Sequence, residues 1–402
     1  MTGVYQATTA KALTLSIAPD EHSVVDHFSR AYQKRINQLR QAAAGSNTYR
    51  IRSMAASILR SYAGRFSAMV RTVHPDEARS VTLSALVNRT GNLNPRLAQL
   101  ERVSVRVKRK LGGGGRPIVS FGPARRAYQV MCADMLKSVM PLQPFECLAQ
   151  PRGADQMTSR VIAALQSGVG DHVVTADVRN CFGSIRKEAL TELLPLPGWA
   201  VRAIILISDQ TQLGLQANHM EPCFPLDEAA RQGLPQGAST SGLILSRAIL
   251  GPTLAMTGFA DRLFLYGDNI TVVAQSRLEG EQILGTLRSV LQDSPAGPLA
   301  IGEHSIRSVR EKIELVKYAI LPVPQRYGGG FRIVPSPKSY RRFEERVKER
   351  AAAGATATEI DQYSRNWIAA FPLWQPNDLS HSYLRMTATL AWLAGQSAQW
   401  SI

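Results

Sequence analysis

The chain has 402 residues, of which 45% are hydrophobic, and a formal net charge of +16 at pH 7. This length and apolar content suffice for about two or three packed subdomains, and the excess of Lys and Arg favours a polyanionic partner. No charge-free apolar run is long enough to span a membrane, since the longest candidate, residues 240–259, contains Arg247.

The N-terminal segment and the cysteines point to a cytoplasmic protein. Residues 1–20 lack a basic stretch followed by an apolar core and a cleavage site, so we expect no export. The four cysteines form no C-x-x-C pair and have no His at ligand spacing, which predicts reduced, partly buried thiols. They are Cys132, Cys147, Cys181 and Cys223.

The basic residues gather in two tracts that contain no Asp or Glu. Residues 28–72 carry nine Lys and Arg, and residues 102–126 carry eight. A run of charge is usually a solvated helix face, but two acid-free tracts are typical of nucleic-acid binding. We therefore predict that these tracts contact nucleic acid.

Hydrophobic periodicity predicts helices in the first tract and a strand pair in the second. Apolar residues at helical spacing predict helices over residues 21–44 and about 49–73. Valines alternate with polar residues over residues 103–108, which is the period of a half-exposed strand, and residues 116–119 follow a four-glycine turn as the returning strand. A basic hairpin of this kind is suited to folding over a triphosphate.

Further along, an apolar, β-rich run ends on Asp177, and helices are expected over residues 188–194 and 201–213. Two short strands, residues 262–266 and 270–274, then flank a Gly-Asp-Asn turn that carries Asp268. This tripeptide is also an ordinary hairpin turn. However, a strand that places one Asp beside a hairpin tip with another builds the hard-oxygen pair that Mg²⁺ prefers.

Between these two acids lies a turn-rich loop, residues 233–243, which opens into an apolar helix. Its small residues allow a ligand to approach the backbone closely. Two Mg²⁺ ions held about 4 Å apart can activate a primer 3′-hydroxyl and stabilise the pyrophosphate that leaves a nucleoside triphosphate.

In order and spacing these motifs resemble the bacterial reverse transcriptases, the group that includes group II intron, retron and defence-associated enzymes. The resemblance covers about residues 100–335. It is carried by Gly115–Ile118, Pro123–Arg126 with Gln129, Arg152 with Gly153, Asp177 with Phe182, Leu234–Ser241, Tyr266–Asn269, and Lys312 with Val316–Leu321.

The resemblance implies an α+β fold of the right-hand polymerase type, with fingers, a palm on an antiparallel sheet, and a helical thumb. It assigns residues 1–100 to a basic helical extension and the start of the fingers. The fingers follow over residues 101–172, the palm over 173–335 and the helical thumb over 336–402. The aromatic-rich C-terminal region could equally hold an oligomer interface.

The implied activity is that of an RNA-directed DNA polymerase that extends a nucleic-acid or protein primer with dNTPs. Asp177 and Asp268 would be the catalytic acids and would hold two Mg²⁺ ions, or Mn²⁺, together with a backbone carbonyl near Val178. Phe182 is either a core aromatic or the gate that excludes a ribose 2′-hydroxyl. The other substrate-binding candidates are Arg116, Gln236, Gly237, Asn269 and Lys312, and the nucleic-acid-binding candidates are Lys110, Arg125, Arg126 and Tyr266.

The implied partners are an RNA template, in particular a dedicated non-coding RNA, and the DNA product. A partner protein or a second copy of the chain is compatible, no membrane is expected, and antiviral defence is the implied setting. One departure matters, because Asn269 stands where the family usually carries a second Asp. This leaves open a catalytically silent, palm-fold RNA-binding scaffold, and an RNA-dependent RNA polymerase, although Phe182 argues against the latter.

Overall fold

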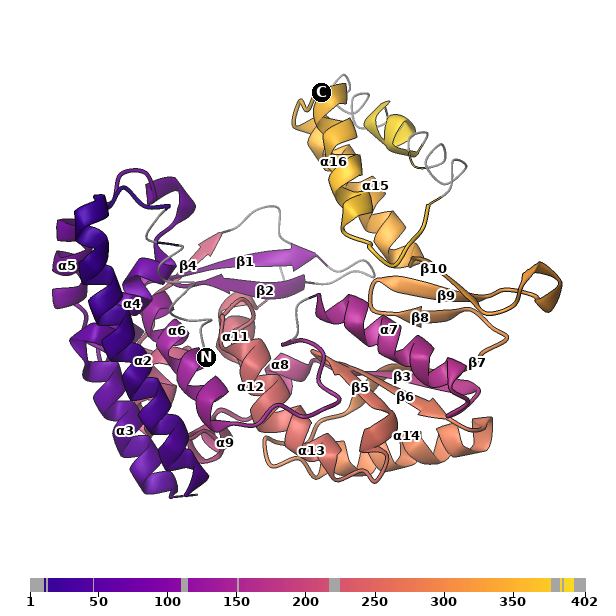
Figure 1. Ribbon diagram of the computed structural model, residues 1–402, viewed down its shortest axis with the longest axis horizontal. Helices are drawn as coiled ribbons and strands as arrows, with labels where there is room; N and C mark the ends of the chain where they lie inside the picture. The colour runs from indigo at the N-terminus through magenta and orange to yellow at the C-terminus, as the bar shows by residue number, and fades with distance from the viewer. Residues whose placement is uncertain are drawn as a thin grey trace. The chain divides into compact units, whose positions relative to one another are not determined.

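The computed structural model separates into two compact units, which are described one at a time (Figure 1). The structure describes residues 11, 14–45, 47–109, 115–149, 152–216, 225–376, 384 and 387–393. The first unit comprises Met1–Pro144, Arg179–Met256 and Ser289–Ala300, and the second comprises Phe145–Val178, Thr257–Arg288 and Ile301–Ile402. Across the described residues, no helix combines the length and apolar character needed to cross a membrane.

The first unit is dominated by helices, and α4 packs against α2, α5 and α6. Its longer helices are α2 (His22–Ala44), α3 (Thr48–Arg60), α4 (Tyr62–Thr72), α5 (Leu83–Gly91) and α6 (Pro123–Val139). The expected single helix over residues 49–73 is wrong, because it is two helices that break at Ser61. That residue has extended backbone, and its hydroxyl accepts a hydrogen bond from Gly64 N to begin α4.

Within this bundle a buried carboxylate ties three helices together. Asp134 of α6 is 5% exposed and forms an ion pair of 2.5 Å with Arg71 of α4. The hydroxyl of Tyr32, on α2, donates to the same carboxylate at 3.1 Å. Burial, together with the Asp134 charge, raises the pKa of Tyr32 well above its usual value, so the phenol stays protonated as a donor.

A small sheet of order β2-β1-β4 completes the main features of this unit. Its strands β1 (Val103–Arg109) and β2 (Gly115–Ser120) are antiparallel, as predicted, and β4 (Leu213–Gln216) runs parallel to β1. The expected helix over residues 201–213 is therefore wrong beyond Ile205. A π-helical turn, Val201–Ile205, is followed by a hydrogen-bonded loop and then by β4.

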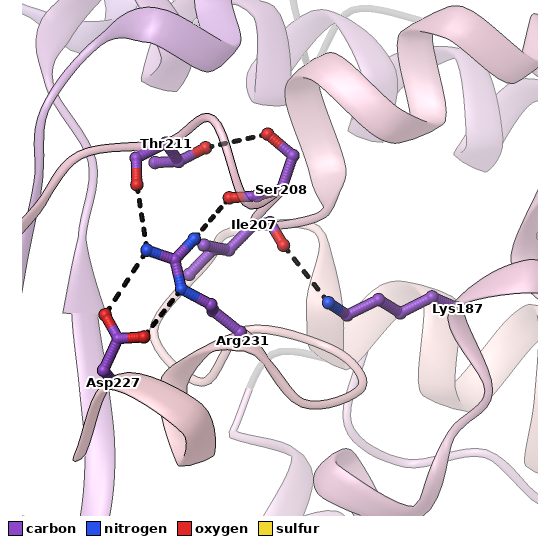
Figure 2. A network of polar contacts seen from close by, with 6 residues as sticks. All are labelled: Lys187, Ile207, Ser208, Thr211, Asp227 and Arg231. Carbon is purple, nitrogen blue, oxygen red and sulfur yellow. Dashed lines mark hydrogen bonds and ion pairs between the residues drawn. The ribbon is translucent and has the colours of Figure 1, made fainter. Parts of the chain in front are cut away.

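Arg231 stabilises that loop (Figure 2). Its guanidinium donates to the backbone carbonyls of Ser208 and Thr211 and pairs with Asp227 at 2.9 Å. Lys187 donates to the Ile207 carbonyl at 3.3 Å from another side of the same loop. Three backbone carbonyls of the loop between the π-helical turn and β4 thus have donors.

The remaining short elements of the first unit connect these parts. They are η1 (Pro19–Glu21), η2 (Pro75–Glu77), η3 (Ala98–Leu100), α8 (Cys181–Ser184), α9 (Lys187–Leu193), α10 (Gly198–Ala200), α11 (Leu226–Arg231), α12 (Ser241–Ile244), η5 (Leu245–Leu250) and α13 (Gly251–Ala255).

The second unit is built on a four-stranded antiparallel sheet of order β5-β6-β3-β7. Its strands are β5 (Leu263–Tyr266), β6 (Asn269–Ala274), β3 (His172–Val178) and β7 (Ile301–Ser308). They confirm the predicted α+β class and the predicted hairpin around Asp268. Alternate residues of a strand point to opposite faces of the sheet. In this sheet both faces carry apolar side chains, which are covered by helices and by a second sheet.

On one face, α7 (Gly153–Gln166) contributes Met157, Val161 and Leu165 to a core with Val173 of β3 and Phe264 of β5. On the other, α14 (Arg277–Gln292) approaches closely at Gly280, where a Cβ would lie 3.2 Å from Val174 and 3.0 Å from Ile306. A residue without a side chain allows this helix to reach the sheet.

The second sheet, of order β10-β9-β8, leads into the C-terminal helices. It comprises β8 (Ile313–Leu315), β9 (Tyr318–Pro322) and β10 (Phe331–Pro335), and α15 (Pro337–Ala352) and α16 (Ala357–Ala369) follow; η6 (Ala260–Arg262) and η7 (Gln325–Tyr327) are single turns. Trp367 of α16 packs on Phe343 at 4.8 Å and on Phe371 at 4.6 Å between ring centroids. Aromatic rings of the C-terminal region thus pack on one another.

Three of the four cysteines, Cys132, Cys147 and Cys181, are buried and unbridged, as predicted. Burial raises the pKa of the Cys147 thiol, and it raises that of Cys132 strongly, which keeps both protonated. Cys223 lies outside the described residues.

We expect Asp134→Ala to lower the free energy of unfolding by about 3–5 kcal/mol, because it leaves the largely buried Arg71 guanidinium without its counter-charge. Tyr32→Phe removes one hydrogen bond from the same carboxylate and should cost only about 1 kcal/mol. Urea unfolding followed by circular dichroism measures both. Equal losses in the two variants would show that the ion pair contributes nothing beyond the phenol contact.

Candidate functional site

Of the two predicted catalytic acids, Asp177 lies on β3, and Asp268 lies in the hairpin turn just before β6, the strand that pairs with β3. Asp177 of β3 is the register partner of Asn269, the first residue of β6. The next residue, Val178, donates its backbone N–H to the Asp268 carbonyl at 3.1 Å. Gly267 takes a φ of +64° at the hairpin turn, a conformation that glycine adopts without strain. The backbone pairing therefore holds the two acidic residues together.

Asp177 also lies at an irregularity in the sheet. Its strand pairs with β7 on the other edge, and the register shifts between Ala176 and Val178. Such a bulge bends the strand and redirects a side chain. Gly302 of β7 faces this point, and a Cβ there would lie 2.7 Å from Asp177 Oδ1. A glycine in β7 thus leaves space around the carboxylate.

The surroundings of the Asp177 carboxylate disfavour its ionised form. Burial raises its pKa, the charges of Glu303 and Asp268 raise it further, and a hydrogen bond from the Glu303 backbone acts in the opposite direction. Its Oδ1 is buried and accepts no hydrogen bond from any residue in the described part of the chain. A buried carboxylate oxygen without a donor is the environment that a bound cation would satisfy.

Sequence reasoning missed Glu303, which adds a third acidic side chain to the surroundings of Asp177. It is exposed, on β7, and no motif marks it. Its position follows only from the pairing of β3 with β7, which brings together residues more than a hundred positions apart. A local pattern contains no signal for this proximity. Within the described residues no group of three or more His, Cys, Asp or Glu side chains has the arrangement of a complete metal centre.

Asn269 makes contacts that a second aspartate could not. Its Nδ2 donates to Asp268 Oδ1 at 3.0 Å and to the Tyr266 carbonyl at 3.3 Å. An aspartate at this position would be acceptor-only when ionised and would repel Asp268. Asn269 therefore adds no charge and supplies a hydrogen bond that orients the Asp268 carboxylate.

The other predicted site residues of this unit, Tyr266 and Lys312, make their described side-chain contacts with residues other than the two acids. Tyr266 is half-buried beside the α7 core, and burial, followed by the Asp155 charge, raises its pKa. Lys312 forms an ion pair of 2.8 Å with Glu314, and both side chains are about half exposed. No contact between Lys312 and either acid is found among the described residues, so its assignment to the pyrophosphate stays a prediction.

In the first unit, the loop predicted to hold substrate lies against strand β2. The Gln236 carbonyl accepts a hydrogen bond from Val119 N at 2.8 Å. Gly237 has a φ of +107°, and a Cβ there would overlap the Val119 carbonyl. Ser241 Oγ donates to the Pro235 carbonyl at 2.8 Å and closes the loop on itself. Gln236 and Gly237 are thus held beside the strand that carries Arg116.

The same loop contacts the segment that carries Phe182. Leu234 N donates to the Phe182 carbonyl at 2.8 Å. Gly233, with a φ of +54°, leaves no room for a side chain at this contact. The structure therefore gathers the β2 strand, Phe182 and the Gln236 loop, which come from three separate parts of the sequence, within one unit.

The position of Arg125 corrects the prediction that it contacts nucleic acid. It is completely buried, donates to the carbonyls of Ile204 and Leu206, and lies 4.7 Å from the Phe121 ring centroid. Burial lowers its pKa to about 10. Its side chain is part of the core, where a buried cation needs the carbonyl acceptors it has found.

Two further candidates complete the set. Arg126 is partly buried, and its Nε is enclosed without a hydrogen-bond partner among the described residues. Lys110 lies outside the described residues. Both remain predicted contacts for nucleic acid.

Comparisons with known proteins do not identify the family of this chain. No family model and no curated protein matches the chain. Solved structures that resemble it include the apo telomerase of Candida tropicalis truncated from the C-terminal domain, at 10% identity and a TM-score of 0.36, covering 56% of this chain and 54% of that one. Telomerase of Candida albicans in complex with a fragment of telomeric RNA matches at 7% identity and a TM-score of 0.37, covering 76% and 61%. Sicinivirus 3Dpol RNA-dependent RNA polymerase matches at 12% identity and a TM-score of 0.38, covering 73% and 70%.

The chain therefore spans 54% and 61% of the two telomerase chains, less than two thirds of either. Likeness at these TM-scores assigns neither a family nor an activity. The functional interpretation rests on the residues and contacts described above.

The raised pKa of Asp177 predicts a pH-dependent gain of stability in Asp177→Asn. A carboxyl whose pKa is raised above its usual 3.8 in the folded state lowers stability as pH rises through the folded pKa. The variant should melt at a higher temperature than the wild type near neutral pH, and the two should converge as the pH falls below about 3.8. Thermal melts across this range measure the difference. A gap that persists unchanged in acid would exclude ionisation as its cause.

Proposed function

We propose that this protein is a template-directed nucleic-acid polymerase, and specifically an RNA-directed DNA polymerase that uses dNTPs. The observation that carries the proposal is the pairing of β3 with β6, which sets Asp177 opposite Asn269, the neighbour of Asp268. Asp177 Oδ1 is buried there and has no hydrogen-bond partner among the described residues. The four-stranded sheet would be the palm of a right-hand polymerase, the β1–β2 hairpin part of the fingers, and the C-terminal helices the thumb.

The donor set fits Mg²⁺. Carboxylate oxygens and a backbone carbonyl are hard ligands, and Mg²⁺ usually keeps several waters and takes its remaining ligands from phosphates. Asp177, Asp268 and the Val178 carbonyl would hold the ions, with Mn²⁺ as a substitute. When bound, the metal would lower the pKa of a primer 3′-hydroxyl and offset the charge on the triphosphate.

The protein's own residues would hold the nucleotide for this reaction. The Arg116 guanidinium would bind the phosphates, and Gln236 and Gly237, in the loop closed by Ser241, would position the template base and the nucleotide. The 3′-oxygen would then form a bond to the α-phosphorus as the bond to pyrophosphate breaks, and the hydroxyl proton would pass to a water molecule. Lys312 would leave its ion pair with Glu314 and would neutralise or protonate the departing pyrophosphate.

Asn269 bears on whether the palm is active. Its hydrogen bond to Asp268 Oδ1 favours an orienting role and supports an active site with two acids. The dedicated RNA partner and the role in antiviral defence come from the family resemblance. They are tested by sequencing the RNA that copurifies and by challenging cells with phage.

Purified protein should incorporate labelled dNTPs on its copurifying RNA with Mg²⁺ or Mn²⁺, and Asp177→Ala should reduce this by about 100-fold or more. Asp209→Ala, which changes an exposed aspartate in the first unit, is the matched control and should retain activity. Preference for NTPs would favour the RNA polymerase alternative. No incorporation with either substrate would favour a scaffold or the need for a partner protein.

Phe182→Ala should relax the choice of sugar, because an aromatic ring under the ribose position excludes a 2′-hydroxyl by its volume. We expect incorporation of NTPs relative to dNTPs to rise by about 10- to 100-fold while dNTP use is retained. The ratio of kcat/KM values measures this. A variant that only melts at a lower temperature, with unchanged sugar preference, would make Phe182 a core aromatic.

A further inference from the structure

One face of α2 is a polar groove that the proposed polymerase site does not use. The groove has a volume of about 460 Å³, and its described lining comes entirely from this helix. The lining residues are Arg30, Gln33, Lys34, Asn37, Gln38 and Gln41. They recur at intervals of three and four, so they form one stripe along the helix.

The stripe lies opposite the face that packs into the protein. Tyr32, Ile36 and Leu39 of the same helix are buried against its neighbours. Arg30, Lys34 and Gln41, by contrast, are exposed. The lining contains no apolar residue and no acid, which distinguishes this face from a surface that awaits another helix.

The basic side chains of this stripe, unlike others in the same tract, are little used in contacts within the protein. Elsewhere in the acid-free tract, Arg52 donates to three backbone carbonyls, Arg65 to the Leu93 carbonyl, and Arg71 pairs with Asp134. Arg30 makes only a long bond of 3.4 Å to the Asp26 carbonyl. Within the described residues, neither Arg30 nor Lys34 forms an ion pair, so both keep their charge for a partner.

We propose that this α2 groove binds the sugar–phosphate backbone of RNA. Two cations one helical turn apart are suited to phosphates, whose neutralisation releases counterions. The four amide side chains both donate and accept hydrogen bonds, which suits the ribose 2′-hydroxyl that is absent from DNA. An acidic protein would also need an apolar or aromatic anchor, and the groove lining has none.

The inference extends beyond nucleotide transfer, because it assigns RNA binding to a surface that contains none of the proposed catalytic residues. It therefore holds or fails independently of the reaction. A protein with Asp177→Asn should retain this binding, which separates loss of the groove from loss of the polymerase site.

The test measures binding of a labelled RNA hairpin, and of a DNA hairpin of the same sequence, by fluorescence anisotropy at several salt concentrations. R30Q/K34Q should weaken RNA binding by about tenfold near 0.1 M salt and reduce the salt dependence by roughly one to two counterions. Glutamine has nearly the helix propensity of Arg and Lys, so α2 should remain folded, which circular dichroism verifies.

The matched control is R35Q/R40Q, which removes the same charge from exposed positions of the same helix outside the groove. It should weaken binding much less. Q38A/Q41A changes no charge and should narrow the preference for RNA over DNA. An unchanged RNA affinity in R30Q/K34Q, or an equal loss of affinity in R35Q/R40Q, would overturn the proposal that the groove binds RNA. Equal affinity of the wild-type protein for the RNA and DNA hairpins would overturn the preference for RNA.

Discussion

The backbone pairing of β3 with β6 is the constraint on which the candidate site depends. It places Asp177 opposite Asn269 and lets Val178 N donate to the Asp268 carbonyl, so the two acids are neighbours before any ligand is considered. The cost appears as a raised pKa at Asp177 and as a buried oxygen that has no donor in the described part of the chain. The apolar core between the sheet and α7 helps to stabilise the unit that contains this unfavourable charge. Retaining such a group is typical of functional sites, because a fold selected for stability alone would replace it.

Asn269 gives the hairpin tip a specific chemistry. It carries no charge, and its amide donates a hydrogen bond to Asp268 Oδ1. The exposed Glu303 on β7 adds negative potential near Asp177 from the other side of β3. The charge around the acid pair therefore does not follow from the hairpin motif alone, and the third acidic side chain comes from a strand that the motif does not include.

The substrate-binding candidates show how glycine allows a loop to approach other parts of the backbone. Gly233 contacts the Phe182 carbonyl and Gly237 contacts the Val119 carbonyl, and each has a positive φ. Any larger residue would separate the loop from one of these partners. Arg231 holds the preceding segment through Ser208 and Thr211, so the loop starts from a well-supported position (Figure 2). These contacts give the residues between Gly233 and Ser241 a defined path without regular secondary structure.

Local patterns were enough to predict the Asp177 strand, the Gly-Asp-Asn hairpin, the basic β-hairpin and the amphipathic helices, because periodicity and turn chemistry act over a few residues. Which side chains meet depends instead on how distant segments pack. At Ser61, whose hydroxyl caps α4, one predicted helix is in fact two. Arg125, which the sequence suggested would be exposed, is buried and donates to a carbonyl of a turn far along the chain. Glu303 lies near Asp177 because of strand register across more than a hundred residues. Burial and register arise from the packing of segments far apart in the chain, and no local pattern encodes them.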